Sequence, residues 1–92
     1  MIVSFNCKDT ETLYRTGRTV RWSGIVKVAT RKLQMLESAS KLIDLCAPPG
    51  NRLEGLNGNR AGQHSIRINE QWRVCFSWTE NGPANVEIVD YH

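Results

Sequence analysis

Two arginines and a tyrosine in the last third of the chain have the side chains that a metal-free ribonuclease needs. Arg67, Arg73 and Tyr91 each fall in a segment with β-strand character. Such an enzyme drives a ribose 2′-hydroxyl against the adjacent phosphate, so a base must take the 2′ proton and cations must stabilise the charge that develops on phosphate. Arginine supplies a permanent charge and paired donors, and a neighbouring arginine favours the phenolate form of a tyrosine that acts as base.

Alternation along three expected strands, residues 64–69, 72–78 and 86–91, places these side chains on one face of a sheet. The other face, which we expect to be the core, carries the apolar positions Ile66, Ile68, Trp72, Val74, Phe76, Trp78, Val86 and Ile88. Side chains in a strand alternate with period two, so the opposite face presents Ser65, Arg67, Arg73, Cys75, Ser77, Glu87, Val89 and Tyr91. We therefore expect the Arg73 guanidinium to project from an open, polar sheet face.

A purely structural interpretation uses the same residues. In it, Arg67 or Arg73 pairs with Glu87 across the strands, and Tyr91 is a fraying aromatic residue at the chain end. In the catalytic interpretation, Asp90 and His92 assist proton transfer, whereas a terminal histidine is ordinarily solvated. Spacing alone leaves both interpretations open. The remaining aromatic candidates, which are His64, Trp22, Trp72 and Trp78, are expected in the core rather than on a base-stacking surface.

The first half of the chain has the pattern of helices. Residues 2–5 form a short β-prone run, after which Asp9 is expected to cap a helix over residues 10–16 that ends at Gly17. Ser23 is expected to cap a longer amphipathic helix whose apolar stripe is Trp22, Ile25, Ala29, Leu33 and Leu36. Ser38 or Ser40 then opens a last turn through Leu45.

Helix formation stops at residues 46–50, which contain Pro48 and Pro49. Residues 52–56 are extended, residues 57–62 form a turn, and the three alternating strands follow. An order of short strand, helices and antiparallel strands predicts one α+β domain over residues 1–92, with the helices on one face of the sheet.

Composition excludes several classes of protein. A chain of 92 residues, 40% of them apolar, builds one modest core and is only marginally stable unless a partner binds it. Residues 1–5 are too short for a signal sequence and no apolar run is long enough for a membrane span, so we expect a cytoplasmic protein without membrane contact. Three widely spaced cysteines, Cys7, Cys46 and Cys75, fit a reducing compartment, and the scarcity of histidine argues against a zinc site.

The charge is unevenly distributed although the net charge is only +3. No acidic residue occurs between Glu11 and Glu37, a stretch that contains Arg15, Arg18, Arg21, Lys27, Arg31 and Lys32. Such a bias is typical either of a solvated helix face or of a surface that binds a polyanion, which would be RNA or an acidic partner protein.

Four segments of the second half closely resemble the HigB, or killer-protein, family of toxins: residues 48–54, 62–68, 71–76 and 86–92. The opening residues 2–9, with Phe5 and Lys8, also resemble that family. The resemblance therefore covers nearly the whole chain, and its most specific parts are the Trp72-Arg73 strand and the terminal Asp90-Tyr91-His92.

The resemblance implies a RelE/ParE fold with an N-terminal short strand and two main helices on one face of a four- or five-stranded antiparallel sheet. It implies cleavage of mRNA on the ribosome without a metal or other cofactor, and inhibition by a HigA-type helix-turn-helix antitoxin through which operator DNA is contacted only indirectly. Arg73 takes the role of phosphate stabiliser, and Tyr91, with Asp90 and His92 beside it, that of the terminal catalytic group.

One departure from the family leaves the base open. Some relatives have a histidine and a lysine where this chain has Glu54 and Asn57. Glu54 is then a possible base, and Arg60 or Arg67 a possible replacement for the cation. The expected phosphate-binding residues are Arg67, Arg60, Asn57, Arg18, Arg21 and Lys27. Two alternatives to RNA cleavage share the fold: a ParE-like gyrase inhibitor, and an inactive co-repressor that acts with its antitoxin.

Overall fold

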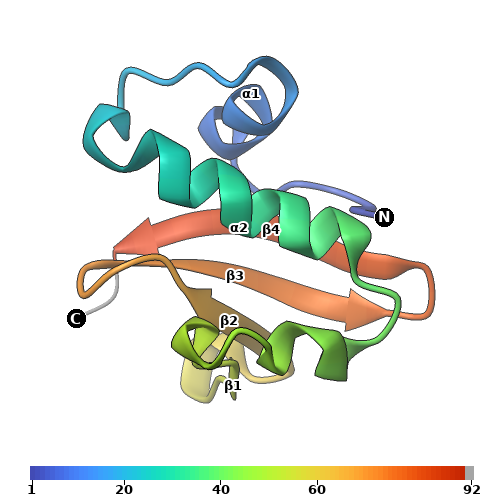
Figure 1. Cartoon of the computed structure of the whole chain (residues 1–92). Coiled ribbons are helices and arrows are strands. Elements are labelled where there is room, and N and C mark those ends of the chain that lie inside the picture. The colour runs from blue at the N-terminus through green and yellow to red at the C-terminus, as the bar shows by residue number, and fades with distance from the viewer. Residues whose placement is uncertain (91–92) are drawn as a thin grey trace.

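Two helices cover one face of a four-stranded antiparallel sheet, as the sequence predicts (Figure 1). The computed structural model describes residues 1–90. The helices are α1 (Lys8–Thr16) and α2 (Val26–Ser38), and the strands, neighbours in chain order, are β1 (Glu54–Gly55), β2 (Gln63–Arg67), β3 (Trp72–Thr79) and β4 (Gly82–Asp90). Four short 3₁₀ turns connect them: η1 (Ser23–Ile25), η2 (Leu42–Cys46), η3 (Pro49–Asn51) and η4 (Gly58–Arg60).

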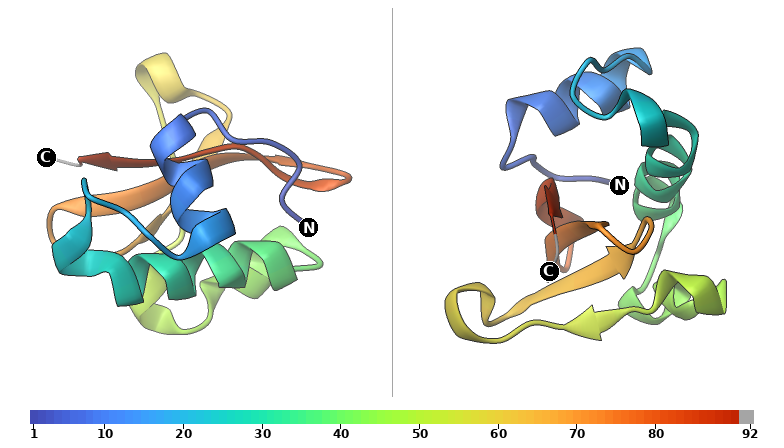
Figure 2. Two further views of the ribbon diagram at one scale, coloured as in Figure 1. Left: turned by 90° about the horizontal axis from the view of Figure 1, so that it is seen from above. Right: turned by 90° about the vertical axis from the view of Figure 1, so that its left-hand side faces the viewer.

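The N-terminal segment extends the sheet at its β4 edge. Phe5 forms a parallel bridge with Val86, and the Val3 amide donates to the Pro83 carbonyl at 2.7 Å. Figure 2 shows this segment running beside β4. The expected short strand over residues 2–5 is thus reduced to one bridge, and β4 does not leave its whole edge unpaired.

The helix starts differ from the predicted ones, whereas the first helix end is as predicted. Gly17 adopts a left-handed conformation (φ 73°) and its amide donates to the Leu13 carbonyl, which ends α1. Asp9 is not the N-cap: α1 begins at Lys8, two residues earlier than predicted, with Cys7 at the N-cap position, and the Asp9 carboxylate pairs with Arg21. Ser23 does not cap α2 either, because residues 23–25 form the η1 turn and α2 begins at Val26.

The core lies between the helices and the inner face of the sheet, on the residues that alternation selects. Its fully or almost fully buried members include Trp22, Ala29, Leu33 and Leu36 from the helical half and Ile66, Val74, Phe76, Val86 and Ile88 from the strands. Ile25, expected in the same stripe, is only partly buried. Trp22 meets Trp72 edge to face at 6.2 Å between ring centroids, and Trp78 also packs against the core. The expectation that the tryptophans belong to the core is confirmed.

A buried polar contact joins α2 to the chain that leads into β1. Lys32, only 8% exposed, donates to the side-chain oxygen of Asn51, which is fully buried in η3. The Asn51 amide donates in turn to the carbonyls of Leu45 (3.1 Å) and Ala47 (3.3 Å). Burial lowers the pKa of Lys32, because the charged ammonium is less well solvated there. Asn51 therefore stabilises the turns that precede β1 and compensates the Lys32 charge.

We expect Asn51→Ala to lower the free energy of unfolding by about 2–4 kcal/mol, since it leaves a buried ammonium without its acceptor and two carbonyls without a donor. Urea denaturation followed by circular dichroism measures the change. Asn59→Ala, at an exposed position of η4, is the control and should change stability by less than about 0.5 kcal/mol. Equal effects of the two substitutions would contradict this role of Asn51.

Candidate active site

A pocket of about 460 Å³ opens on the face of the sheet opposite the helices. β1 and the loop after it provide one wall, β3 contributes a central residue, and the end of β4 closes the far side. Its lining residues are Glu54, Gly55, Leu56, Asn57, Arg60, Cys75, Val89 and Asp90. Four of these, Glu54, Asn57, Arg60 and Asp90, are predicted site residues. The fold brings them to one place from opposite edges of the sheet, and we call this the Glu54 pocket.

Arg73 lies beside this pocket and is buried, which corrects the expectation of a guanidinium projecting from an open face. The residue is 6% exposed. Its Nε donates to the Ser65 hydroxyl at 2.7 Å, and one Nη donates to the Arg52 carbonyl at 2.7 Å. The same Nη lies 3.6 Å from the Glu54 carboxylate. Arg73 thus connects β3, β2 and the start of β1.

The alternation of side chains correctly predicts the face of the sheet on which Arg73 lies, but it does not predict that another segment of the chain covers this face. Ser65 and Cys75, on the same face as Arg73, are 0% and 1% exposed. β1 pairs with β2, Glu54 opposite Ser65, and the chain from β1 curls below the sheet (Figure 2, right). Because β1 is only two residues long and lacks an alternating pattern, the sequence contains little signal for this cover.

Glu87 pairs with Arg60 rather than with Arg67 or Arg73. The Arg60 guanidinium donates to the Glu87 carboxylate at 2.7 Å and to the Gln63 side-chain oxygen at 3.1 Å. The hydrogen bond with Glu87 raises the pKa of Arg60. Arg60, a cation of the pocket, is therefore already paired with the carboxylate of Glu87, which lies 27 positions later in the sequence.

Cys75 lies on the floor of the pocket, and sequence reasoning did not include it in the site. Burial is the main reason that its thiol pKa is raised, although the nearby Arg60 opposes the shift. A thiol kept neutral is a poor nucleophile. Cys75 stands opposite Ser65 in β2 and opposite Glu87 in β4. The register of the two hairpins is therefore the signal from which this position could be inferred.

Asp90 ends β4 at the rim of the Glu54 pocket. It stands opposite Trp72 in the ladder, and its carboxylate accepts a hydrogen bond from the Gln71 side chain at 3.1 Å. The predicted catalytic residues Tyr91 and His92 lie outside the described residues. β4 nevertheless leads to the mouth of the pocket and positions Asp90, the first of the three terminal residues.

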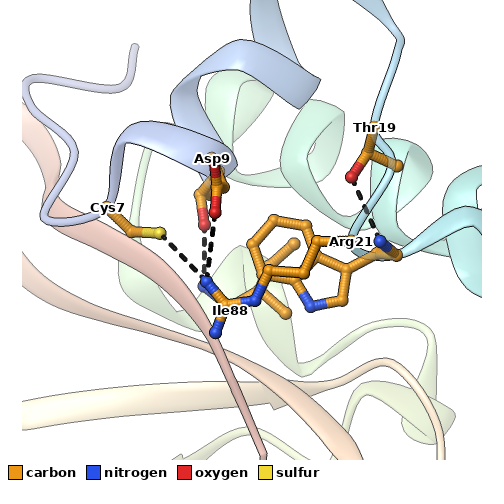
Figure 3. A network of polar contacts seen from close by, with 7 residues as sticks. Cys7, Asp9, Thr19, Arg21 and Ile88 are labelled. Atoms are coloured by element: carbon orange, nitrogen blue, oxygen red, sulfur yellow. Dashed lines mark hydrogen bonds and ion pairs between the residues drawn. The ribbon is translucent and has the colours of Figure 1, made fainter.

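The basic segment does not reach this pocket. Arg21 turns from the loop after α1 back to Asp9 at 3.3 Å (Figure 3). Its guanidinium carbon also lies 4.7 Å from the centroid of the Trp22 ring, over which it stacks. Arg18 and Arg21 line a hollow of about 500 Å³ at that loop, whereas Lys27 lines another on α2. Arg18, Arg21 and Lys27 are therefore distributed over the helical side of the molecule.

Arg67 is likewise absent from the Glu54 pocket. It lines a smaller hollow with Arg52 and Arg73.

Among residues 1–90, no group of three or more His, Cys, Asp or Glu side chains is placed to hold a metal ion. No helix in that range has the length and apolar character of a membrane span.

Residues 3–92 match the HigB-like toxin family, whose members are RelE-like toxins of type II toxin–antitoxin systems. The chain belongs to this family. It is 39% identical over 87 residues to Toxin HigB-1 of Vibrio cholerae, with 92% of each chain covered. It is also 30% identical over 100 residues to Endoribonuclease HigB of Proteus vulgaris, with the whole of both chains covered. The resemblance noted in the sequence is confirmed.

Solved structures agree on the fold at low sequence identity. The YoeB–YefM complex from Staphylococcus aureus matches all of this chain and 95% of the compared chain, with a TM-score of 0.61 and 18% identity. A YoeB/ParE toxin from Agrobacterium tumefaciens matches 99% of this chain and 96% of its own, with a TM-score of 0.53 and 19% identity. These likenesses confirm the RelE/ParE-type architecture of two helices on an antiparallel sheet.

The burial of Arg73 predicts a loss of stability that an exposed arginine would not cause. Arg73→Ala leaves the buried Ser65 hydroxyl and the Arg52 carbonyl without their donor, so the free energy of unfolding should fall by about 1–3 kcal/mol. Glu54→Gln should cost less than about 1 kcal/mol, because the Glu54–Arg73 pair is long and Glu54 is partly exposed. Urea denaturation of both variants measures the difference, and a loss below about 0.5 kcal/mol for Arg73→Ala would contradict the buried network.

Proposed function

We propose that this HigB-family toxin is a ribosome-dependent, metal-independent endoribonuclease that cleaves mRNA at the Glu54 pocket. The observation that carries the proposal is the Glu54 carboxylate beside the Arg73 guanidinium, 3.6 Å apart at the wall of a pocket to which β4 delivers Asp90. A carboxylate next to a fixed cation provides both a proton acceptor and a charge that compensates a phosphate. The relative named Endoribonuclease HigB supports this choice of reaction.

The proposed chemistry is attack by a ribose 2′-oxygen on the adjacent phosphorus. Glu54 takes the 2′ proton as the new bond to phosphorus forms, and the bond from phosphorus to the 5′-oxygen breaks. Arg73 compensates the negative charge that develops on the phosphate oxygens. A proton from the chain end, where Tyr91 and His92 follow Asp90, goes to the leaving 5′-oxygen. The products are a 2′,3′-cyclic phosphate and a 5′-hydroxyl end.

Glu54 replaces Tyr91 as our first candidate for the base because the described geometry places Glu54 in the pocket. Its carboxylate is 44% exposed and so remains accessible to a substrate, whereas most of Arg73 is covered. Preorganisation of this kind is favourable, since the buried arginine is held by Ser65 and Arg52 before substrate arrives. Asn57 and Arg60, from the loop that follows β1, contact the bound nucleotide.

The partners that we propose are the ribosome, mRNA and a HigA-type antitoxin. Membership of a family of type II toxin–antitoxin systems supports an antitoxin partner, and the YoeB–YefM complex is an example of this fold bound to another protein. The exposed basic residues Arg18 and Lys27, on the side of the helices, provide a surface for ribosomal RNA or for acidic antitoxin residues. Operator DNA is contacted through the antitoxin.

Expression of the chain in bacteria should arrest growth, and co-expression of its cognate antitoxin should restore it. The expectation rests on membership of the toxin family and is read from colony counts after induction. The inactive control is Glu54→Gln, which should be tolerated at the same level of soluble protein. Normal growth with abundant, folded wild-type protein would contradict the toxin function.

Glu54→Gln should reduce mRNA cleavage in a translation extract by about 10²-fold or more, because the proton acceptor is removed while the shape is kept. The matched control is Glu80→Gln, in the exposed β3–β4 turn, which should cleave at the wild-type rate. Primer extension and end analysis of the RNA measure rate and products. Unchanged cleavage by folded Glu54→Gln would exclude Glu54 as the base.

The same assay in EDTA, with the ribosomes kept intact by polyamines, should proceed at an unchanged rate and yield cyclic or 3′-phosphate ends. Magnesium-dependent release of 5′-phosphate ends would overturn the mechanism. A toxic chain that cleaves no RNA but inhibits gyrase would favour the ParE-like alternative.

A further inference from the structure

We propose that Arg52 and Arg67 form a second phosphate-binding subsite, which holds a backbone phosphate of the RNA strand next to the one cleaved at the Glu54 pocket. The inference rests on the proposed endoribonuclease function and adds to it the path of the substrate strand. We call the site the arginine hollow. It has a volume of about 300 Å³ and is lined by Arg52, Arg67, Asn69, Glu70 and Arg73.

Three separate parts of the chain bring arginines to this hollow. Arg67 ends β2 and stands directly opposite Arg73 of β3 in the antiparallel ladder. Arg52 precedes β1 in a left-handed conformation (φ 46°), a backbone geometry that residues other than glycine adopt rarely. Its carbonyl accepts the hydrogen bond from Arg73. The Arg73 contact thus fixes the backbone of Arg52 beside Arg67.

The charges of the hollow are incompletely compensated within the protein. Like charges directly opposite in a ladder repel, and Arg67 faces Arg73 in this way. Arg73 has Glu54 as an ion-pair partner, but within residues 1–90 neither Arg52 nor Arg67 forms an ion pair. The positive field of Arg67 also reaches the helical side, where it contributes, after burial and Arg31, to the lowered pKa of Lys32. An anion in the hollow would relieve this repulsion.

Glu70 is the carboxylate that lines the hollow, and it is exposed. It reduces the positive charge there without forming an ion pair with any described arginine. The remaining polar neighbour, Asn69, uses its side-chain oxygen to accept hydrogen bonds from the backbone amides of Gln71 and Trp72, both at 2.8 Å. Asn69 therefore shapes the hairpin that presents Arg67 and Arg73, and we assign the anion contacts to the arginines.

Continuity with the Glu54 pocket favours RNA over an acidic protein. Arg73 lines the arginine hollow, while Glu54, its ion-pair partner at 3.6 Å, lines the Glu54 pocket, so the two sites adjoin at this ion pair. A strand whose scissile phosphate lies at the Glu54–Arg73 pair has another phosphate one nucleotide away on either side. Guanidinium groups bind phosphate through paired hydrogen bonds, so Arg52 and Arg67 are suited to hold it.

The test is binding of a short 2′-O-methyl RNA, which lacks the attacking hydroxyl and cannot be cleaved, to the full chain by fluorescence anisotropy. Arg52→Gln with Arg67→Gln should weaken binding about tenfold, the effect of losing one charged contact of about 1.4 kcal/mol. The plot of log binding constant against log salt concentration should become less steep by about 0.7, the value for one phosphate contact on a single strand. Glu70→Gln should act in the opposite direction and tighten binding.

The matched control is Lys8→Gln with Lys41→Gln, which removes the same charge from exposed positions that do not line the hollow. Binding by this control should stay within about twofold of the wild type. An equal loss in the control and in the arginine variant would overturn the subsite, because net charge alone would then explain binding. Tighter binding of a hexaglutamate peptide than of RNA, lost on Arg52→Gln with Arg67→Gln, would overturn it in favour of an acidic protein partner.

Cleavage assays separate this inference from the function on which it rests. In the translation extract, Arg52→Gln with Arg67→Gln should raise KM several-fold and leave kcat within about twofold, since the subsite binds RNA in the ground state and in the transition state alike. A wild-type protein that cleaves no RNA overturns the proposed function. A wild-type protein that cleaves normally, with an arginine variant that binds and cleaves identically, overturns the subsite alone.

Discussion

The burial of one guanidinium, that of Arg73, constrains the whole face of the sheet on which the candidate site lies. A buried arginine cannot lose its charge, so it must be surrounded by acceptors. Here Ser65 supplies a hydroxyl, Arg52 a backbone carbonyl, and Glu54 a carboxylate at longer range. Each acceptor belongs to a different part of the chain from Arg73, and satisfying the charge therefore brings β1, β2 and the turn before β1 into one arrangement.

The consequence is a candidate site whose proposed catalytic and binding residues are positioned by the same contacts. The residues before β1 are held from one side by Arg73 and from the other by the buried Lys32–Asn51 contact with α2. Glu54 is thereby placed at the wall of the Glu54 pocket, and Arg52 at the arginine hollow. Such an arrangement needs little reorganisation when an anionic substrate binds, which is the condition under which fixed charges contribute most to catalysis.

Much of the fold and part of the site could be predicted from the sequence. The alternation in residues 64–69 and 72–78 correctly separates Ile66, Val74 and Phe76 from Arg67 and Arg73, and the resemblance to HigB toxins matches the family found over residues 3–92. Glu54, Asn57, Arg60 and Asp90 do share a pocket. The ion pair of Glu87 was not predictable, because several arginines lie within reach of its strand. Arg60 forms the pair because the η4 turn brings its side chain to Glu87.

The sequence by itself determined which residues share a face, where the first helix ends and where the strands follow one another, because these depend on local periodicity and on the conformational freedom of residues such as Gly17. Only the tertiary structure decided that the face carrying Arg73 is covered, that Asp9 pairs with Arg21 instead of capping α1, and that Arg52 and Arg67 line the same hollow. The alternation of side chains along a strand shows to which face of the sheet a residue points. Burial and ion pairing depend instead on which distant segment packs against that face. A two-residue strand such as β1 has almost no sequence pattern from which this packing can be inferred.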